Sequence, residues 1–182
     1  MQEEIKQLRV SIDSIAQLTS GLKPIPVCNF SNNVIGKFSE TKYVASKEIT
    51  KAVDSLYMAK AWLGKVLQEL GTESPYKSGY KTKDDIQPTA DVANHNDKVS
   101  NIYHLNWKEM NHIEKVDWLR TEISKLTDNI FNLKMDLQES ANVFGSKEPA
   151  IKTAIATTLS YQYLSEARFH LGFELQRIKE SN

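Results

Sequence analysis

Apolar residues recur along most of the chain at steps of three and four residues, the spacing that places side chains on one face of an α-helix. This spacing predicts four helices: one up to Gly21, one over residues 46–70, one whose apolar seam runs over 116–137, and one over 149–179. No alternating strand pattern of useful length is present. The sequence therefore predicts an all-α fold, an antiparallel bundle of about four helices in a single domain over 1–182.

Glycine and proline separate these stretches at the positions expected for helix ends. Gly71 follows the second helix as a stop signal, and Pro149 stands in a favourable first-turn position for the fourth. In that last helix the apolar positions begin at Ile151 and Ile155. Between Val116 and Leu137 the steps alternate regularly over three heptads, which is typical of a seam that packs against another helix.

Two segments between the helices lack periodicity. Residues 22–44 form an irregular linker in which short β pairing remains open, and residues 72–106 form a long loop rich in Ser, Pro, Gly, Lys, Asp and Asn. Loops of that length in compact domains are usually functional or disordered. We expect the long loop to be mobile in the free protein and to become ordered when a ligand binds.

The second and fourth predicted helices contain the same motif. Leu-x-x-Ala-Lys/Arg-x-x-Leu-Gly-x-x-Leu-Gln begins at Leu56 and again at Leu164. Glycine inside a helix costs roughly 1 kcal/mol relative to alanine, so Gly64 and Gly172 predict a close approach of two helices. The repeat has two interpretations. The two helices can pack in equivalent places of a pseudo-symmetric bundle, or the two cations at matching positions of the repeat can share a ligand-facing role. Those cations are Lys60 and Arg168.

The repeated segments also carry a resemblance. AKAWLGKVLQELG and EARFHLGFELQRI, with IQPTAD between them, resemble the small helical-hairpin anti-defence proteins of bacteriophages, which include the anti-CBASS and anti-Thoeris sponges. The resemblance implies an oligomeric protein in the cytoplasm of the bacterial host. It also implies that the protein sequesters a cyclic nucleotide immune signal, a cyclic oligonucleotide or a cyclic ADP-ribose-type molecule, without cleaving it.

Charge and composition limit the kinds of partner that the protein can bind. The chain has 23 basic and 23 acidic residues, so no strong basic field indicates DNA, RNA or an anionic membrane. An anionic ligand must then be held by a local pocket. The apolar runs are short and the N-terminus is charged, so we expect neither a membrane span nor a signal peptide and interpret the chain as cytoplasmic. The single cysteine, Cys28, allows no internal disulfide.

Catalytic and metal-binding patterns are weak. Glu109 and His112 have the Glu-x-x-His spacing of a di-iron bundle, but the second copy that such a site needs is missing. His95 and His104 lie close to them in sequence, which is more often polar surface than a metal site. Cys28 has no histidine near it, and no phosphate loop or nucleophile elbow is present. We expect no enzyme activity, no metal and no cofactor.

The candidate ligand-binding residues are aromatic rings and cations near the helix ends. A loop segment alternates rings with positive charge, which could stack a base and neutralise a phosphate, or could be an ordinary polar loop. Two further residues occupy the same place in the repeat, immediately before Leu-Gly, and either line a shared pocket or mark the boundary of the core. With the two repeat cations, the predicted set is Lys60, Trp62, Tyr76, Lys77, Tyr80, Lys81, Arg168 and His170.

These observations favour a phage-encoded sponge for a cyclic nucleotide signal. The alternative is a structural or protein-interaction bundle, with no small-molecule ligand, whose heptad seam binds a partner helix. We also expect the chain to form homo-oligomers, because the seam over 116–137 and the glycine-faced helices offer more packing surface than a four-helix monomer needs.

Overall fold

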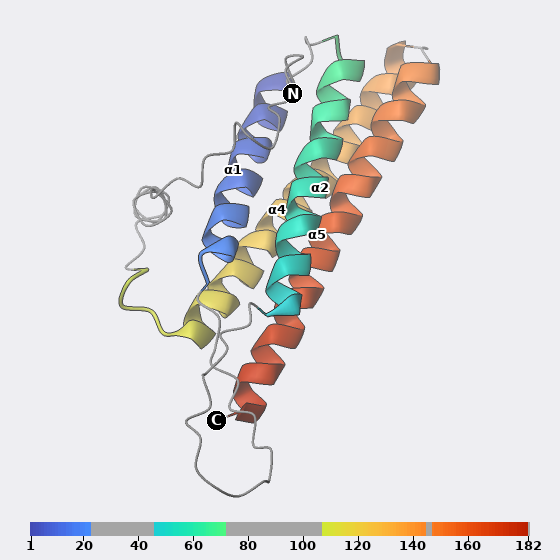
Figure 1. Cartoon of the computed structure of the whole chain (residues 1–182). Helices are drawn as coiled ribbons and strands as arrows, with labels where there is room; N and C mark the ends of the chain where they lie inside the picture. Colours follow the sequence, from blue (N-terminus) through green and yellow to red (C-terminus); the bar gives the residue numbers. More distant parts are fainter. Residues whose placement is uncertain (23–45, 72–106, 145–146, 182) are drawn as a thin grey trace, which may run out of the picture.

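A computed structural model of the chain describes residues 1–22, 46–71, 107–144 and 147–181. These residues form four α-helices: α1 (Gln2–Ser20), α2 (Lys47–Glu69), α4 (His112–Phe144) and α5 (Lys147–Ser181) (Figure 1). No strand occurs within the described ranges. The predicted all-α bundle is confirmed. The linker 23–45 and the loop 72–106, with the predictions made for them, lie outside the described residues.

Local signals in the sequence account for the helix ends. Gly71 adopts φ +78°, a conformation that favours glycine, and its N–H donates to the carbonyl of Gln68. The third predicted helix begins earlier than its apolar seam does. There the Asn111 side chain accepts from the Glu114 N–H at 2.9 Å, and the Glu114 carboxylate accepts from the Asn111 N–H at 2.7 Å. This reciprocal cap satisfies two N–H groups at the start of α4.

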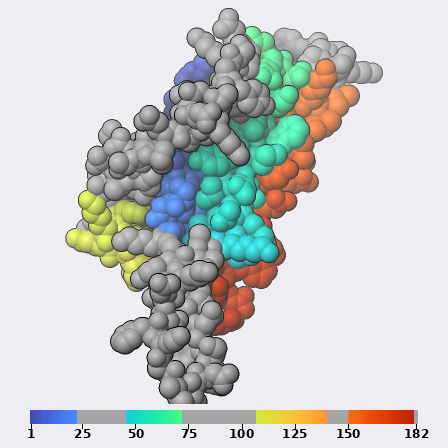
Figure 2. Space-filling model, viewed as in Figure 1, coloured from blue at the N-terminus to red at the C-terminus, as the bar shows by residue number. Residues whose placement is uncertain are grey.

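The four helices enclose one core, and each packs against two neighbours. α1 and α5 both pack between α2 and α4, and each neighbouring pair is antiparallel (Figure 1). The Ser160 hydroxyl donates to the Ala59 carbonyl at 3.0 Å between α5 and α2, and the Gln2 amide donates to the Leu70 carbonyl at 2.9 Å between α1 and α2. In the space-filling view α1 and α2 lie side by side, with α5 along the edge of α2 (Figure 2).

The seam of the third predicted helix is buried inside this bundle. Its seven apolar residues are at most 7% exposed. The partner of the seam is therefore the chain's own helices, and the seam is not available to a separate partner helix. The seam residues are Val116, Leu119, Ile123, Leu126, Ile130, Leu133 and Leu137.

The expected apolar face of the last helix is only partly correct. Leu164, Leu171 and Ile178 are buried, but Ile151 and Ile155 are 59% and 53% exposed. α5 carries apolar side chains on two opposite faces, because positions 151 and 155 lie about half a helical turn away from the buried stripe. Ile151 and Ile155 continue the apolar spacing of the helix but do not belong to its buried face.

The structure extends the internal repeat from one helix to two. Besides the α2–α5 match at an offset of 108 residues, α1 matches α4 at an offset of 111. Each antiparallel pair, α1–α2 and α4–α5, is thus one copy of the same helical hairpin, and the two copies run in opposite directions in the bundle. An approximate twofold axis produces this relation. The matched positions are Ile5, Leu8, Arg9, Ile12 and Ile15 in α1, and Val116, Leu119, Arg120, Ile123 and Leu126 in α4.

Candidate functional site

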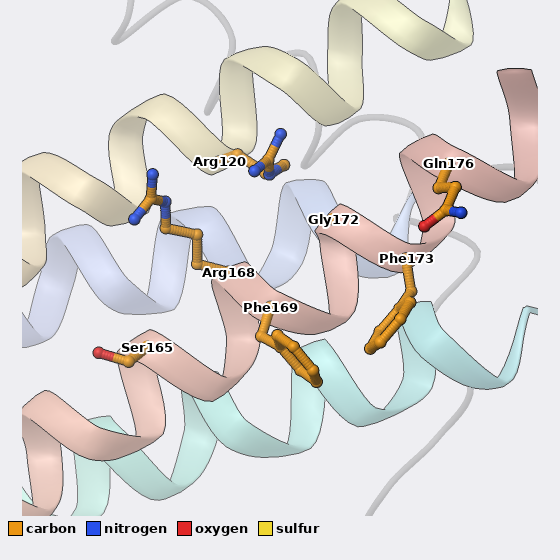
Figure 3. Close-up of a pocket in the computed structure, with 7 residues that line it drawn as sticks. All are labelled: Arg120, Ser165, Arg168, Phe169, Gly172, Phe173 and Gln176. Atoms are coloured by element: carbon orange, nitrogen blue, oxygen red, sulfur yellow. The ribbon is translucent and has the colours of Figure 1, made fainter.

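A pocket of about 390 Å³ opens between α4 and α5. α4 contributes one arginine, and α5 contributes the other lining residues (Figure 3). The two arginine side chains lie on the α4 side of α5, while two phenyl rings extend from the other side of the same helix. The lining consists of Arg120, Ser165, Arg168, Phe169, Gly172, Phe173 and Gln176.

The arginine from α4 lies against α5 at Gly172. A Cβ atom at Gly172 would lie 3.8 Å from both Nε and Nη2 of Arg120, so the guanidinium rests against the helix at this glycine. The close approach predicted for Gly172 therefore involves a side chain and not a second helix backbone. Nε of Arg120 is buried without a hydrogen-bond partner among the described residues, and Nη1 lies 3.8 Å from a carboxylate oxygen of Asp117.

Arg168 brings a second positive charge to the same pocket. Its side chain is exposed, and within the described ranges it has no hydrogen bond or ion pair. Two guanidinium groups close to one pocket repel each other unless a negative charge lies between them. Arg120 and Arg168 thus form a site suited to an anion that offers two or more oxygens, such as a phosphate.

The rim of the pocket is aromatic. Phe169 and Phe173 are 60% and 46% exposed, and their ring centroids lie 4.5 Å apart in an edge-to-face arrangement. Large apolar rings at the surface leave apolar area in contact with water, which a ligand or partner can cover. A flat heterocycle that stacks on a ring would gain about 1 to 3 kcal/mol.

Lys60 and Arg168, the paired cations of the repeat, do not share a pocket. The Lys60 ammonium forms an ion pair with Asp13 of α1, whereas Arg168 lines the pocket beside α4. α2 and α5 run antiparallel with Ala59 beside Ser160, so Lys60 lies about 13.5 Å along the bundle from Arg168. The structure supports the packing interpretation for Lys60 and leaves Arg168 as a ligand-facing candidate.

Trp62 and His170 are not brought together either. His170 Nδ1 lies 2.6 Å from a carboxylate oxygen of Glu48 near the start of α2. The hydrogen bond with His170 lowers the pKa of Glu48. Trp62 packs half-buried against the core, and its indole N–H is buried with no acceptor among the described residues. Of the two interpretations of this pair, the structure favours the one in which they mark the boundary of the core.

The remaining predicted ligand residues cannot be placed. Tyr76, Lys77, Tyr80 and Lys81 lie outside the described residues. Arg120, Phe169 and Phe173 line the pocket but were not among the predicted residues. The repeat of Leu8-Arg9 as Leu119-Arg120 was the signal for the arginine.

A separate buried polar cluster lies where α2 and α4 begin. Glu174 of α5 is fully buried and accepts hydrogen bonds from the Ser46 hydroxyl at 2.5 Å and from Arg177 at 2.7 and 3.0 Å. His112 Nε2 lies 3.6 Å from the same carboxylate. Burial raises the pKa of Glu174, but the contacts with His112, Arg177 and Ser46 outweigh it and lower the pKa to about 2.

Two further sequence hypotheses bear on the described part of the chain. No group of three or more His, Cys, Asp or Glu side chains there could hold a metal ion. Within the same ranges, no helix combines the length and the hydropathy that a bilayer crossing needs.

A search for related proteins found no matching family model, curated protein or solved structure. The resemblance to phage anti-defence proteins stays a prediction.

Proposed function

We propose that the protein binds a cyclic nucleotide signal at the α4–α5 pocket and sequesters it without cleavage, as a phage-encoded sponge that blocks bacterial anti-phage defence. The observation that carries the proposal is the pair Arg120 and Arg168. Two helices bring these cations to one pocket, and no carboxylate among the described residues lies within 3.5 Å of either guanidinium. The exposed rings of Phe169 and Phe173 supply a stacking surface across α5 from these cations.

The strength of such a site can be bounded. A hydrogen bond to a charged group contributes about 1.5 to 3 kcal/mol, and a stacked base about 1 to 3 kcal/mol. Two arginine contacts and one stacked base then give about 4 to 9 kcal/mol before the cost of immobilising the ligand. A micromolar dissociation constant is equivalent to about 8 kcal/mol after that cost, so it requires these contacts at the upper end of their range together with further contacts.

The chemistry of the lining favours sequestration over turnover. Hydrolysis of a phosphodiester at neutral pH needs a group that can take up and release a proton near that pH, or a metal ion. The described lining consists of arginine, serine, phenylalanine, glycine and glutamine. None of these titrates near neutral pH, so the arrangement suits binding of an intact ligand.

Calorimetry tests the binding step. We expect at least one member of a panel of cyclic dinucleotides, cyclic trinucleotides and cyclic ADP-ribose isomers to bind the wild-type chain. Arg168→Met should weaken that binding at least tenfold, with its melting temperature unchanged. Lys179→Met, which removes an exposed cation from the last turn of the same helix, is the matched control and should bind like wild type. Binding by none of the panel would contradict the proposal.

A second candidate function is protein–protein interaction by self-association, favoured by the outward face of α5. Ile151, Ile155, Phe169 and Phe173 are all exposed and share that face. Their spacing is symmetric about Gln162, so an antiparallel copy would place Ile151 against Phe173 of the partner copy and Ile155 against its Phe169. A twofold interface requires this self-complementary pattern. A second copy of the chain is therefore the partner that we propose for this face.

Light scattering tests self-association. We expect a dimer at micromolar concentration, and we expect Ile155→Glu to give a monomer with an unchanged helical content and melting temperature. Phe169 and Phe173 belong both to this face and to the pocket lining, and Ile155 belongs only to the face; Ile155→Glu leaves the rings uncovered and should bind nucleotide at least as well as wild type. A wild-type chain that is strictly monomeric would contradict this candidate.

A further inference from the structure

The first hairpin contains a counterpart of the α4–α5 pocket. The offsets that relate α1 to α4 and α2 to α5 place Arg9 at the position of Arg120, and Lys60 at that of Arg168. Gly64 and Gln68 match Gly172 and Gln176 in the same way. The counterpart therefore retains the cations, the glycine and the amide, and it differs in what surrounds them.

In the first hairpin a carboxylate of the chain itself, that of Asp13, lies beside these cations. Asp13 forms an ion pair with the Lys60 ammonium, and the two side chains are about one-third exposed, at 32% and 28%. Arg9 lies against the same turn, where its Nε donates to the Lys60 carbonyl at 3.3 Å. Burial and the negative charge of Asp13 raise the pKa of Tyr57, which stands where the second hairpin has Ser165. The first hairpin thus neutralises Lys60 with its own carboxylate.

The second hairpin lacks that carboxylate. The counterpart of Asp13 is Ser124, whose hydroxyl donates to the Arg120 carbonyl at 3.0 Å. Both residues lie four positions after the matched arginine, so they occupy the same face of their helices. The first hairpin therefore pairs Lys60 with an internal anion. In the second hairpin Asp117 lies 3.8 Å from Arg120, Arg168 has no ion pair among the described residues, and a small neutral side chain stands at the place of Asp13.

We infer that Asp13 stands in the first hairpin where a phosphate group of the ligand stands in the second, beside Ser124 and in contact with Arg168. The inference rests on the proposed function and deepens it: it locates the phosphate, adds Ser124 to the binding site, and predicts one nucleotide site per chain. A carboxylate and a phosphate both offer charged oxygens to a cation, so one can occupy the place of the other.

A matched pair of variants tests the inference. Inorganic pyrophosphate is the probe, and its binding is measured by ³¹P NMR at low ionic strength. Ser124→Asp supplies the second hairpin with its own carboxylate, whereas Ser124→Asn has nearly the same shape and no charge. We expect the aspartate variant to bind pyrophosphate at least tenfold more weakly than wild type and to melt no lower. The asparagine variant should bind within threefold of wild type.

The reverse change tests the first hairpin. Asp13→Asn releases Lys60 from its ion pair, and we expect the variant to bind a second pyrophosphate per chain. If Arg168→Met abolishes binding but Ser124→Asp and Ser124→Asn bind alike, the phosphate lies elsewhere in the pocket; the proposed function then stands and this inference is wrong. If wild type binds neither pyrophosphate nor any cyclic nucleotide, both are wrong.

Discussion

Glu174 provides a sharp test of how the bundle is held together at the end where α2 and α4 begin. The carboxylate is fully buried and is held by the Ser46 hydroxyl, by two nitrogens of Arg177 and by the nearby ring of His112. We consider the substitution Glu174→Gln, which keeps the shape of the side chain and removes its charge. The polar partners then face a neutral amide in a buried place.

The loss of stability expected for Glu174→Gln follows from the lowered pKa of Glu174. The pKa of Glu174 is about 2 in the folded protein instead of 4.5, and each pH unit of that interval corresponds to about 1.4 kcal/mol. The ionised carboxylate therefore contributes about 3 kcal/mol to the free energy of unfolding. Because the folded pKa is lowered, this stability is present above pH 4.5 and is lost as the pH falls from 4.5 through 2. For a chain of this length, 3 kcal/mol corresponds to about 6 to 12 °C in melting temperature.

Thermal melts followed by circular dichroism test this expectation. At pH 7 Glu174→Gln should melt about 6 to 12 °C below wild type, and the gap should close as the pH is lowered from 5 to 2. Glu166→Gln is the control, since Glu166 is exposed on the same helix, and it should melt within about 2 °C of wild type. If Glu174→Gln has the same melting temperature as Glu166→Gln at pH 7, or if it melts as far below wild type at pH 2 as at pH 7, the ionised carboxylate does not stabilise the bundle.

Three further substitutions separate packing from binding. Leu171→Ala removes a fully buried side chain and should cost about 2 to 5 kcal/mol in denaturant unfolding. Gly172→Ala should raise stability by up to about 1 kcal/mol, because the added Cβ meets Arg120 only at 3.8 Å, an ordinary contact; a loss of stability would contradict this. Lys60→Met should lower the melting temperature because Asp13 loses its partner, whereas Arg168→Met should not; equal effects would place the two cations in the same role.

Most of the fold could be predicted because burial follows periodicity. The seam from Val116 to Leu137 was recognisable from its steps of three and four, and all its positions are buried. Ile151 and Ile155 show where this reasoning fails. α5 has apolar residues on opposite faces, and spacing alone does not say which face meets the core. The choice depends on where α2 and α4 pack, which is tertiary information.

The candidate site was less predictable for a related reason. The repeat singled out Arg168, which lines the pocket, but it also paired Trp62 with His170, as though matching positions lie together. α2 and α5 are antiparallel, so most matching positions lie toward opposite ends of the bundle. Arg120 comes from another helix, and only the arrangement in space brings it to Arg168.

We propose that the protein removes a cyclic nucleotide from solution and keeps it intact. Ultrafiltration of the protein with the best-binding nucleotide of the panel, followed by chromatography, measures both parts of the claim. We expect the nucleotide to be missing from the filtrate of the wild-type protein and to return unchanged, in full, after the protein is heat-denatured. It should stay in the filtrate of the double variant Arg120→Met, Arg168→Met. A nucleotide that passes freely through with the wild type, or that returns as a cleaved product, would contradict the account.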